Sequence, residues 1–163
     1  MKYRFFAVID TNVIISAILK QGFPSEIISL IDSGNVVPLY DYRMLDEYKD
    51  VLNRDKFSFD KDIINDILSR IKDFGILVKD VEKTKRSLKD KGDIPFFEVK
   101  EDTGELDSYL VTGNLKDFPD DPYIINSKTA IIVMNQVERY LTLDERYEEK
   151  VYSALAEFMV NGL

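Results

Sequence analysis

The sequence predicts an α/β fold, a three-layer α/β/α sandwich around a central, mainly parallel sheet of about five strands. Two observations support this prediction. Short apolar runs alternate with amphipathic segments along the 163-residue chain, as the strand–helix units of a parallel sheet do. The first run, residues 5–9, is uninterrupted and rich in aromatic and β-branched residues, which is typical of a strand buried on both faces. The length fits one domain, and we expect residues 1–163 to form it.

Each expected strand is a short apolar run bounded by polar or turn-forming residues. In chain order, the expected strands are residues 5–9, 36–40, 76–78, 106–112 and 123–125. Pro38 lies inside the second run and indicates a position near a sheet edge or an irregularity, because proline cannot donate a ladder hydrogen bond. Asp107 stands near the start of the fourth run, where we expect it to be a turn residue.

Each expected helix has apolar residues three or four positions apart, and most have a capping residue at one end. In chain order, the expected helices are residues 13–19, around 27–31, about 42–53, the segment between Asp60 and Gly75, a helix that starts near Asp93, residues 130–140, and a last helix capped by Asp144. Asp41, Asp60 and Ser127 are further predicted N-terminal caps. The charged segment 79–92 is expected to be a connecting loop.

Composition excludes several kinds of chemistry. The chain has no Cys and no His, which rules out disulfides, thiol nucleophiles, imidazole metal ligands and imidazole acid–base catalysis. The formal net charge of −8 argues against a broad nucleic-acid-coating surface, since such binding comes from Lys and Arg. Without thiol or imidazole groups, any chemistry must rely on carboxylates.

The apolar runs are too short to span a membrane and the N-terminus does not resemble a secretory signal, so we expect a cytoplasmic protein.

Several polar side chains are expected at the carboxyl edge of the sheet, where open α/β sheets bind their ligands. Asp10 follows the first strand, and Asn114 and Asp117 follow the fourth. Glu47 lies at the border of an apolar helix face, and Asp93 stands where a helix begins. Carboxylates gathered in a cleft repel one another unless they are protonated or bridged by cations, and oxygen-only ligand sets select Mg²⁺ or Mn²⁺. The sequence thus outlines a metal site.

Plainer interpretations exist for the same residues. Glu47 fits an ordinary boundary charge, and helix capping alone accounts for Asp93. With 30 acidic residues in the chain, a set of this kind can be chosen from any acidic sequence. A cluster of basic residues in the expected loop serves solubility, or attracts a phosphate backbone beside the site. These residues are Lys83, Lys85, Arg86, Lys89 and Lys91.

Four segments, in this order along the chain, resemble the successive signatures of the PIN-domain family. They are VIDTNVI at residues 8–14, LDEYKDVL at 45–52, DIPFFEV at 93–99 and DSYLVTGN at 107–114. The subgroup most similar in appearance is the one described as toxin components of toxin–antitoxin systems, related to the VapC toxins. The resemblance covers about residues 5–125 and leaves a C-terminal helical extension, about residues 126–163, unmatched.

The resemblance implies a PIN-like ribonuclease that uses Mg²⁺ or Mn²⁺ to cleave RNA phosphodiester bonds. Asp10 would be the central ligand, and Glu47 and Asp93 the other two catalytic acids. Asn114 and Asp117 would be further metal ligands. The residues that would order the site are Thr11, Asn12 and Thr112. The implied partners are RNA rather than DNA, an antitoxin protein, and a second copy of the chain in a homodimer.

Two positions depart from the family pattern. Asn114 stands where the family often has Asp, and its neutral oxygen should weaken the binding of a second cation, although Asp117 is placed to compensate. Lys100 replaces a small apolar residue. An alternative function is therefore a catalytically weak PIN-like module that binds RNA or protein, which the net charge of −8 also favours.

Two other enzyme classes fit the sequence less well. A haloacid-dehalogenase-type phosphatase needs a second Asp two residues after the first, and this chain has Asn12 there. A serine hydrolase of the usual triad type needs a histidine, which the chain lacks.

Overall fold

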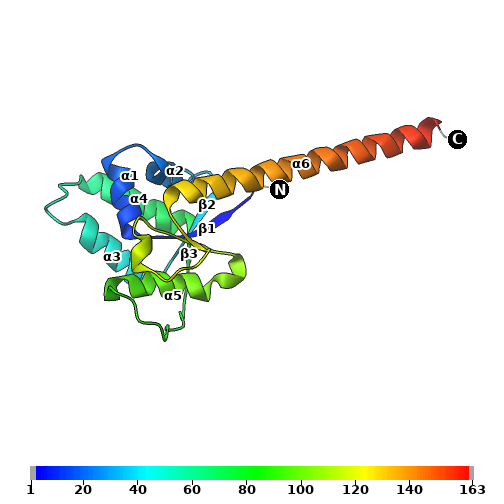
Figure 1. The fold of residues 1–163 in the computed structure, drawn as a ribbon. Helices are drawn as coiled ribbons and strands as arrows, with labels where there is room; N and C mark the ends of the chain where they lie inside the picture. Colours follow the sequence, from blue (N-terminus) through cyan, green and yellow to red (C-terminus); the bar gives the residue numbers. More distant parts are fainter. Residues whose placement is uncertain (1–2, 162–163) are drawn as a thin grey trace.

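A computed structural model describes residues 3–161. Five strands form one sheet in the order β3-β2-β1-β4-β5, and every neighbouring pair is parallel. The strands are β1 (Phe5–Ile9), β2 (Val36–Tyr40), β3 (Ile76–Leu77), β4 (Tyr109–Val111) and β5 (Ile124–Ile125). Helices cover both faces of this sheet (Figure 1), so the predicted α/β/α sandwich with a five-stranded parallel sheet is confirmed.

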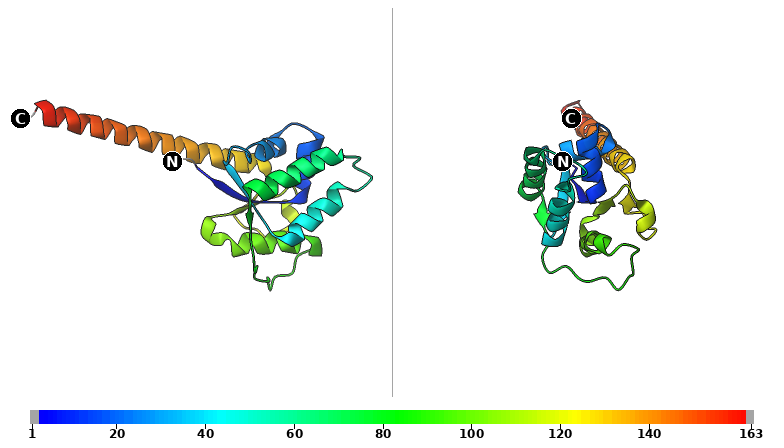
Figure 2. Two further views of the ribbon diagram at one scale, coloured as in Figure 1. Left: turned by 180° about the vertical axis from the view of Figure 1, so that it is seen from behind. Right: turned by 90° about the vertical axis from the view of Figure 1, so that its left-hand side faces the viewer.

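The helices lie on both faces of the sheet, because the chain places β2 and β3 on one side of β1 and β4 and β5 on the other, and crossovers between parallel strands are right-handed. They are α1 (Thr11–Leu19), α2 (Phe23–Ser29), α3 (Tyr42–Leu52), α4 (Lys61–Phe74), α5 (Ile94–Asp102) and α6 (Ser127–Asn161), with short 3-10 helices η1 (Lys91–Asp93), η2 (Gly104–Leu106) and η3 (Leu115–Asp117). Helix α5 packs against β1, β2 and β4. Helices α1, α2, α4 and the first part of α6 lie on the other side (Figures 1 and 2).

The core lies between these layers and is built by the apolar runs of the sequence. In β1, Phe5, Ala7 and Val8 are fully buried, and so are Phe96 and Phe97 of α5, which packs against β1. Each of the buried Phe and Val side chains contributes about 1.5–3 kcal/mol of hydrophobic stabilisation. Since all strands run in the same direction, the residues that follow β1, β2 and β4 leave the sheet at one common edge.

The C-terminal part of the chain differs from the prediction. One continuous helix, Ser127–Asn161, replaces the two expected helices at residues 130–140 and after Asp144. No Gly or Pro occurs between residues 127 and 161, so nothing interrupts the backbone hydrogen-bond ladder at Asp144. The distal half of α6 projects away from the rest of the molecule (Figures 1 and 2).

Smaller differences concern the ends of strands and helices. Strand β4 spans only Tyr109–Val111, because η2 precedes it and Asp107 takes a left-handed conformation with φ 51°, as expected of a turn residue. The helices α1 and α2 begin at Thr11 and Phe23, earlier than the sequence indicated. None of the described helices has the length and apolar character needed to cross a membrane.

Pro38 is not on an edge strand, because β2 lies between β1 and β3. It pairs with Ala7 of β1, whereas pairing with β3 starts one residue later at Leu39. The chain can pass close to Pro38 because residue 75 is glycine. A Cβ atom there would lie 2.3 Å from the Ile71 carbonyl oxygen and 2.7 Å from the Pro38 carbonyl oxygen.

Candidate functional site

Asp10 lies at the junction of β1 and α1, at the carboxyl edge of the sheet. Its backbone N–H donates to the Val111 carbonyl oxygen at 2.9 Å, which fixes the junction to the end of β4. Asp10 is the N-cap residue of α1, yet its side chain makes no capping hydrogen bond. The side chain is instead held by residues of the neighbouring segments, and the residue is only 5% exposed. A buried carboxylate that does not cap its own helix is available for another purpose.

A hydrogen-bond network orients the Asp10 carboxylate. The Thr112 hydroxyl donates to Asp10 Oδ2 at 2.7 Å, and the Asn12 amide donates to the same oxygen at 3.0 Å. The backbone N–H groups of Gly113 and Asn114 then fix Asn12 Oδ1 and Thr112 Oγ1 at 2.9 and 3.0 Å. Burial raises the pKa of Asp10, and the hydrogen bonds from Thr112, the Thr11 backbone and Asn12 counteract it.

The three residues predicted to order the site therefore act in different ways. Thr112 and Asn12 hold the Asp10 side chain directly. Thr11 contributes through its backbone N–H. Among the described residues, the Thr11 hydroxyl is the one buried side-chain polar atom without a hydrogen-bond partner. A buried hydroxyl of this kind can be satisfied by an ordered water molecule or a bound ligand.

Glu47 faces the same region from α3. Helix α3 is fixed at the end of β1 by the buried Tyr48 hydroxyl, which donates to the Ile9 carbonyl oxygen. Glu47 itself is half-buried at the border of the apolar face, as its position in the sequence indicated. Burial raises its pKa, nearby Arg54 opposes that effect, and the negative charge of Asp10 adds to it. Glu47 is therefore electrostatically coupled to Asp10.

Asp93 completes the group from the start of α5. It occupies the N-cap position but makes no side-chain capping hydrogen bond, so capping does not explain it. Its pKa is raised from 3.8 to about 7, first by burial and then by surrounding carboxylates. In decreasing order of effect, these carboxylates belong to Asp10, Asp90, Asp117 and Glu47. Four acids from separate segments thus act on one carboxyl group, and their repulsion is what a bound cation would relieve.

The residues after β4 have unequal roles. Asp117 is half-buried in η3 and raises the pKa of both Asp10 and Asp93. Asn114 is exposed and joins the site through its backbone N–H, which donates to Thr112. Asp90 acts on both Glu47 and Asp93 although the sequence analysis did not select it. Its only signal in the sequence was its position three residues before Asp93, inside a segment dominated by lysines.

The acidic cluster has the donor atoms of a cation site, but its side chains are not placed as those of an assembled metal site are. Its donors are all oxygens, and none of the described ion pairs involves Asp10, Glu47 or Asp93. The unsatisfied hydroxyl belongs to Thr11, the residue that follows Asp10 in the chain. However, no three acidic side chains of residues 3–161 are placed so that together they could hold one metal ion. The donor types and the unrelieved repulsion fit a divalent cation.

Comparison with known protein families identifies the fold. A family model described as "PIN domain" matches residues 7–116, the segment that contains Asp10, Glu47, Asp93 and Asn114. The chain belongs to the PIN-domain family. PIN domains are generally nucleases and typically use divalent metal ions. Neither a curated protein nor a solved structure matches this chain significantly.

The loop of this PIN domain between β3 and η1, residues 78–90, carries most of the basic cluster. The side chains of Lys83, Lys85, Arg86, Lys89 and Lys91 are all exposed. The loop is attached to α5 by the Thr84 backbone N–H, which donates to Glu98 Oε2 at 2.6 Å. Glu98 is only 3% exposed, and its other oxygen pairs with Arg43 Nη1 at 2.7 Å. The basic loop is thus held in place, and its last residues lead directly to Asp93.

Sequence reasoning missed Glu98 and Arg43. The signal that could have identified Glu98 is its position inside the apolar run of residues 96–99, where a charge must be paired if it is buried. Lys100, the second departure from the family pattern, is also paired. Its Nζ lies 2.6 Å from Asp121 Oδ2 and 5.7 Å from the centre of the Tyr123 ring. Lys100 therefore has a structural role beside Asp121 and Tyr123 and makes no ion pair with the acidic cluster.

Proposed function

We propose that this PIN domain is a divalent-metal-dependent ribonuclease. Asp10, Glu47 and Asp93 would hold Mg²⁺ or Mn²⁺, and Asp117 and Asn114 would supply further oxygen ligands. The observation that supports this most is the electrostatic coupling of four acids around Asp93, which raises its pKa to about 7. Such repulsion destabilises the fold unless a ligand or proton neutralises it, so it is better explained by function than by stability.

The chain's own residues define what each acid does. Thr112 and Asn12 fix the Asp10 carboxylate in one orientation and help to keep it ionised. Near neutral pH the Asp93 carboxyl exchanges a proton with solvent when no cation is present. A divalent cation, when bound, supplies the positive charge that activates water and stabilises the oxygens of the phosphodiester. The absence of histidine is no obstacle to this chemistry.

The basic loop supports a polyanionic substrate. The basic cluster consists of four residues of this loop and Lys91, all exposed. It precedes Asp93 in the chain of a protein whose net charge is −8, so the sign of the charge is reversed locally. Positive charges there can position a phosphate backbone without reading its sequence. The preference for RNA over DNA, and the cytoplasmic location, remain predictions from the sequence.

The direct test is cleavage of single-stranded RNA with Mn²⁺ or Mg²⁺, followed on a gel, with single-stranded DNA as the comparison. We expect wild-type activity that EDTA removes, and at least a hundredfold loss in Asp10→Asn. The matched control is Asp46→Asn, which makes the same chemical change on the exposed side of α3. Equal activity of wild type and Asp10→Asn would reject the proposed site, as would a loss of the same size in Asp46→Asn.

A second candidate is a catalytically weak module that binds RNA. It is favoured by Asn114, which replaces an expected charge, and by the lack of an assembled three-carboxylate site among the described residues. Calorimetric titration with Mn²⁺ separates the two functions. No binding at millimolar Mn²⁺, together with RNA association that is lost when the basic loop is neutralised, would favour the binding module. Metal binding with metal-dependent turnover would reject it.

The antitoxin partner is a proposal of the same kind. It rests on the resemblance to toxin components of toxin–antitoxin systems. A neighbouring reading frame that encodes a small protein with a DNA-binding motif would support it. Inhibition of RNA cleavage by that protein, when the two are mixed, is the biochemical test.

A further inference from the structure

The distal half of α6, residues 140–161, exposes most of its described side chains to solvent. Near its start, α6 packs on the body of the molecule through Ala130, Ile131 and Met134. Contact with the body ends near Glu138, which accepts a hydrogen bond from Asn35 at 3.2 Å. Beyond this point every side chain whose exposure is described is exposed, apart from the half-buried Leu141. We call residues 140–161 the distal helix.

The distal helix carries a stripe of apolar side chains, whose exposure to water is unfavourable. Large side chains recur three or four positions apart and share one face. They are Tyr140, Leu143, Tyr147, Val151 and Leu155, which are 72%, 57%, 69%, 40% and 53% exposed. At 100° per residue, this face is turned by about 150° from the face that Ile131 and Met134 pack on the body. The stripe is therefore not a continuation of the contact with the body.

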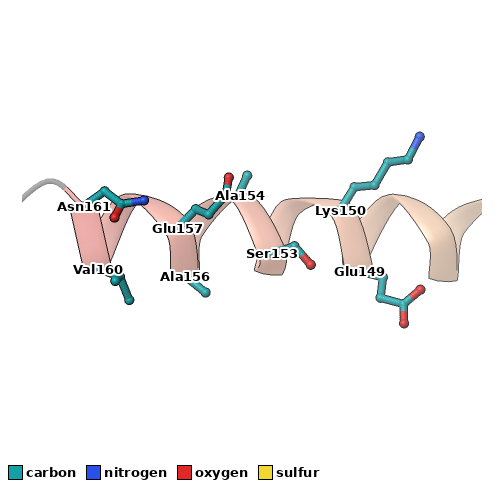
Figure 3. Close-up of a pocket in the computed structure, with 8 residues that line it drawn as sticks. All are labelled: Glu149, Lys150, Ser153, Ala154, Ala156, Glu157, Val160 and Asn161. Atoms are coloured by element: carbon teal, nitrogen blue, oxygen red, sulfur yellow. The ribbon is translucent and has the colours of Figure 1, made fainter.

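An exposed stripe of this kind marks an interface. Helices draw most of their stability from packing an apolar face, and monomers rarely expose a contiguous series of large apolar residues. An open pocket lies along the last turns of the helix, and Figure 3 shows the side chains that line it. Lys150, Ala154 and Glu157 lie together on one side of it. All of its lining residues belong to α6, and the small Ala154 beside the stripe leaves room for another helix to approach.

Charges beside the stripe indicate which partner fits. On a helical wheel, Arg146 and Lys150 lie along one border of the stripe, and Glu157 follows on the same border two turns further. In an antiparallel pair of identical helices, this border of one helix faces the same border of the other, and the two sequences run in opposite directions. If Val151 of one copy lies opposite Ala154 of the other, Glu157 falls between Arg146 and Lys150 of the partner subunit. Two-fold symmetry makes the same contact twice.

We propose that the distal helix is a dimerisation element that pairs antiparallel with α6 of a second copy. In this register Asp144 lies opposite Asn161 of the partner subunit, a carboxylate opposite an amide donor. A parallel pair would place Asp144 against its own copy within the stripe, which is repulsive. The overlap covers residues 144–161, about 27 Å of helix, and starts beyond the last contact with the body. The two catalytic bodies would lie at opposite ends of the paired helices.

Sedimentation of the full chain at micromolar concentration tests the proposal without any activity measurement. We expect twice the chain mass of 18.9 kDa for the wild type. Lys150→Glu and Glu157→Lys should each weaken the dimer at least tenfold, and the double exchange should restore much of the affinity. Glu149→Lys, which reverses a charge on the opposite side of the helix, should leave the dimer unchanged. A monomeric wild type, or equal effects of Glu157→Lys and Glu149→Lys, would overturn the proposal.

The absence of native cysteine allows the direction of pairing to be measured. Mixed Val151→Cys and Ala154→Cys proteins should form a heterodisulfide under mild oxidation faster than either protein alone forms a homodisulfide. Faster homodisulfide formation by Val151→Cys would indicate a parallel pair and would reject the antiparallel arrangement. Circular dichroism of each variant should show unchanged helix content, which separates loss of pairing from loss of folding.

Discussion

Replacing Asp93 with asparagine should stabilise the metal-free protein above neutral pH. In the folded chain the pKa of Asp93 is raised from 3.8 to about 7, chiefly by burial and then by Asp10. A carboxyl group with a raised folded-state pKa stabilises the fold fully below its unfolded pKa, and that contribution is lost as the pH rises through the folded pKa. For Asp93 the loss therefore falls between about pH 4 and pH 7. Asparagine cannot ionise and avoids it.

The size of the effect follows from the pKa shift and the exposure of the side chain. At about 1.36 kcal/mol per pKa unit, a rise from 3.8 to about 7 sets an upper limit of about 4 kcal/mol. Asp93 is only partly buried, so solvent screens much of this energy. We expect Asp93→Asn to raise the free energy of unfolding by about 1–2 kcal/mol at about pH 8, and by almost nothing at about pH 4.

Urea unfolding in the presence of EDTA measures this difference. The chain has nine tyrosines and no tryptophan, so tyrosine fluorescence and circular dichroism are the suitable signals. Asp46→Asn, on the exposed side of α3, is the control and should change stability by less than about 0.5 kcal/mol at either pH. A gain in Asp93→Asn that does not depend on pH, or no gain at about pH 8, would refute the electrostatic reasoning.

Three further predictions concern the hydrogen bonding of Asp10, the close approach at Gly75 and the binding of a metal ion. Thr112→Val removes the hydrogen bond to Asp10 Oδ2 while keeping the side-chain shape, so it should cost about 1–3 kcal/mol in urea unfolding and raise the pKa of Asp10 in an NMR titration. Gly75→Ala should cost more than about 2 kcal/mol, because its Cβ would lie 2.3 Å from the Ile71 carbonyl oxygen, whereas Gly104→Ala meets nothing within 4 Å and should cost less. Millimolar Mn²⁺ should raise the thermal unfolding midpoint of the wild type by several degrees, reversibly with EDTA, and a shift of the same size in Asp10→Asn would contradict metal binding at that residue.

The positions of Asp10 and Glu47 could be predicted because local patterns determine them. An apolar run of β1 type must end where its first polar residue appears, so Asp10 had to lie at a strand terminus. Helical periodicity placed Glu47 at the border of an apolar face, and it is half-buried there. For Asp93, the same local reasoning offered helix capping as a sufficient explanation, and the structure shows no capping hydrogen bond.

The sequence by itself determined the strands, the helices up to α5 and the acids that end or border them, since these depend on neighbours a few residues away. Only the tertiary structure decided what surrounds Asp10. Thr112 donates to it across 102 positions of the chain, and Asp10 and Asp117 act on Asp93 from distant segments. Likewise the burial of Glu98 beside Arg43 depends on how α5 meets α3. Contacts of this kind follow from the strand order β3-β2-β1-β4-β5, which brings distant segments to one edge and which local patterns do not encode.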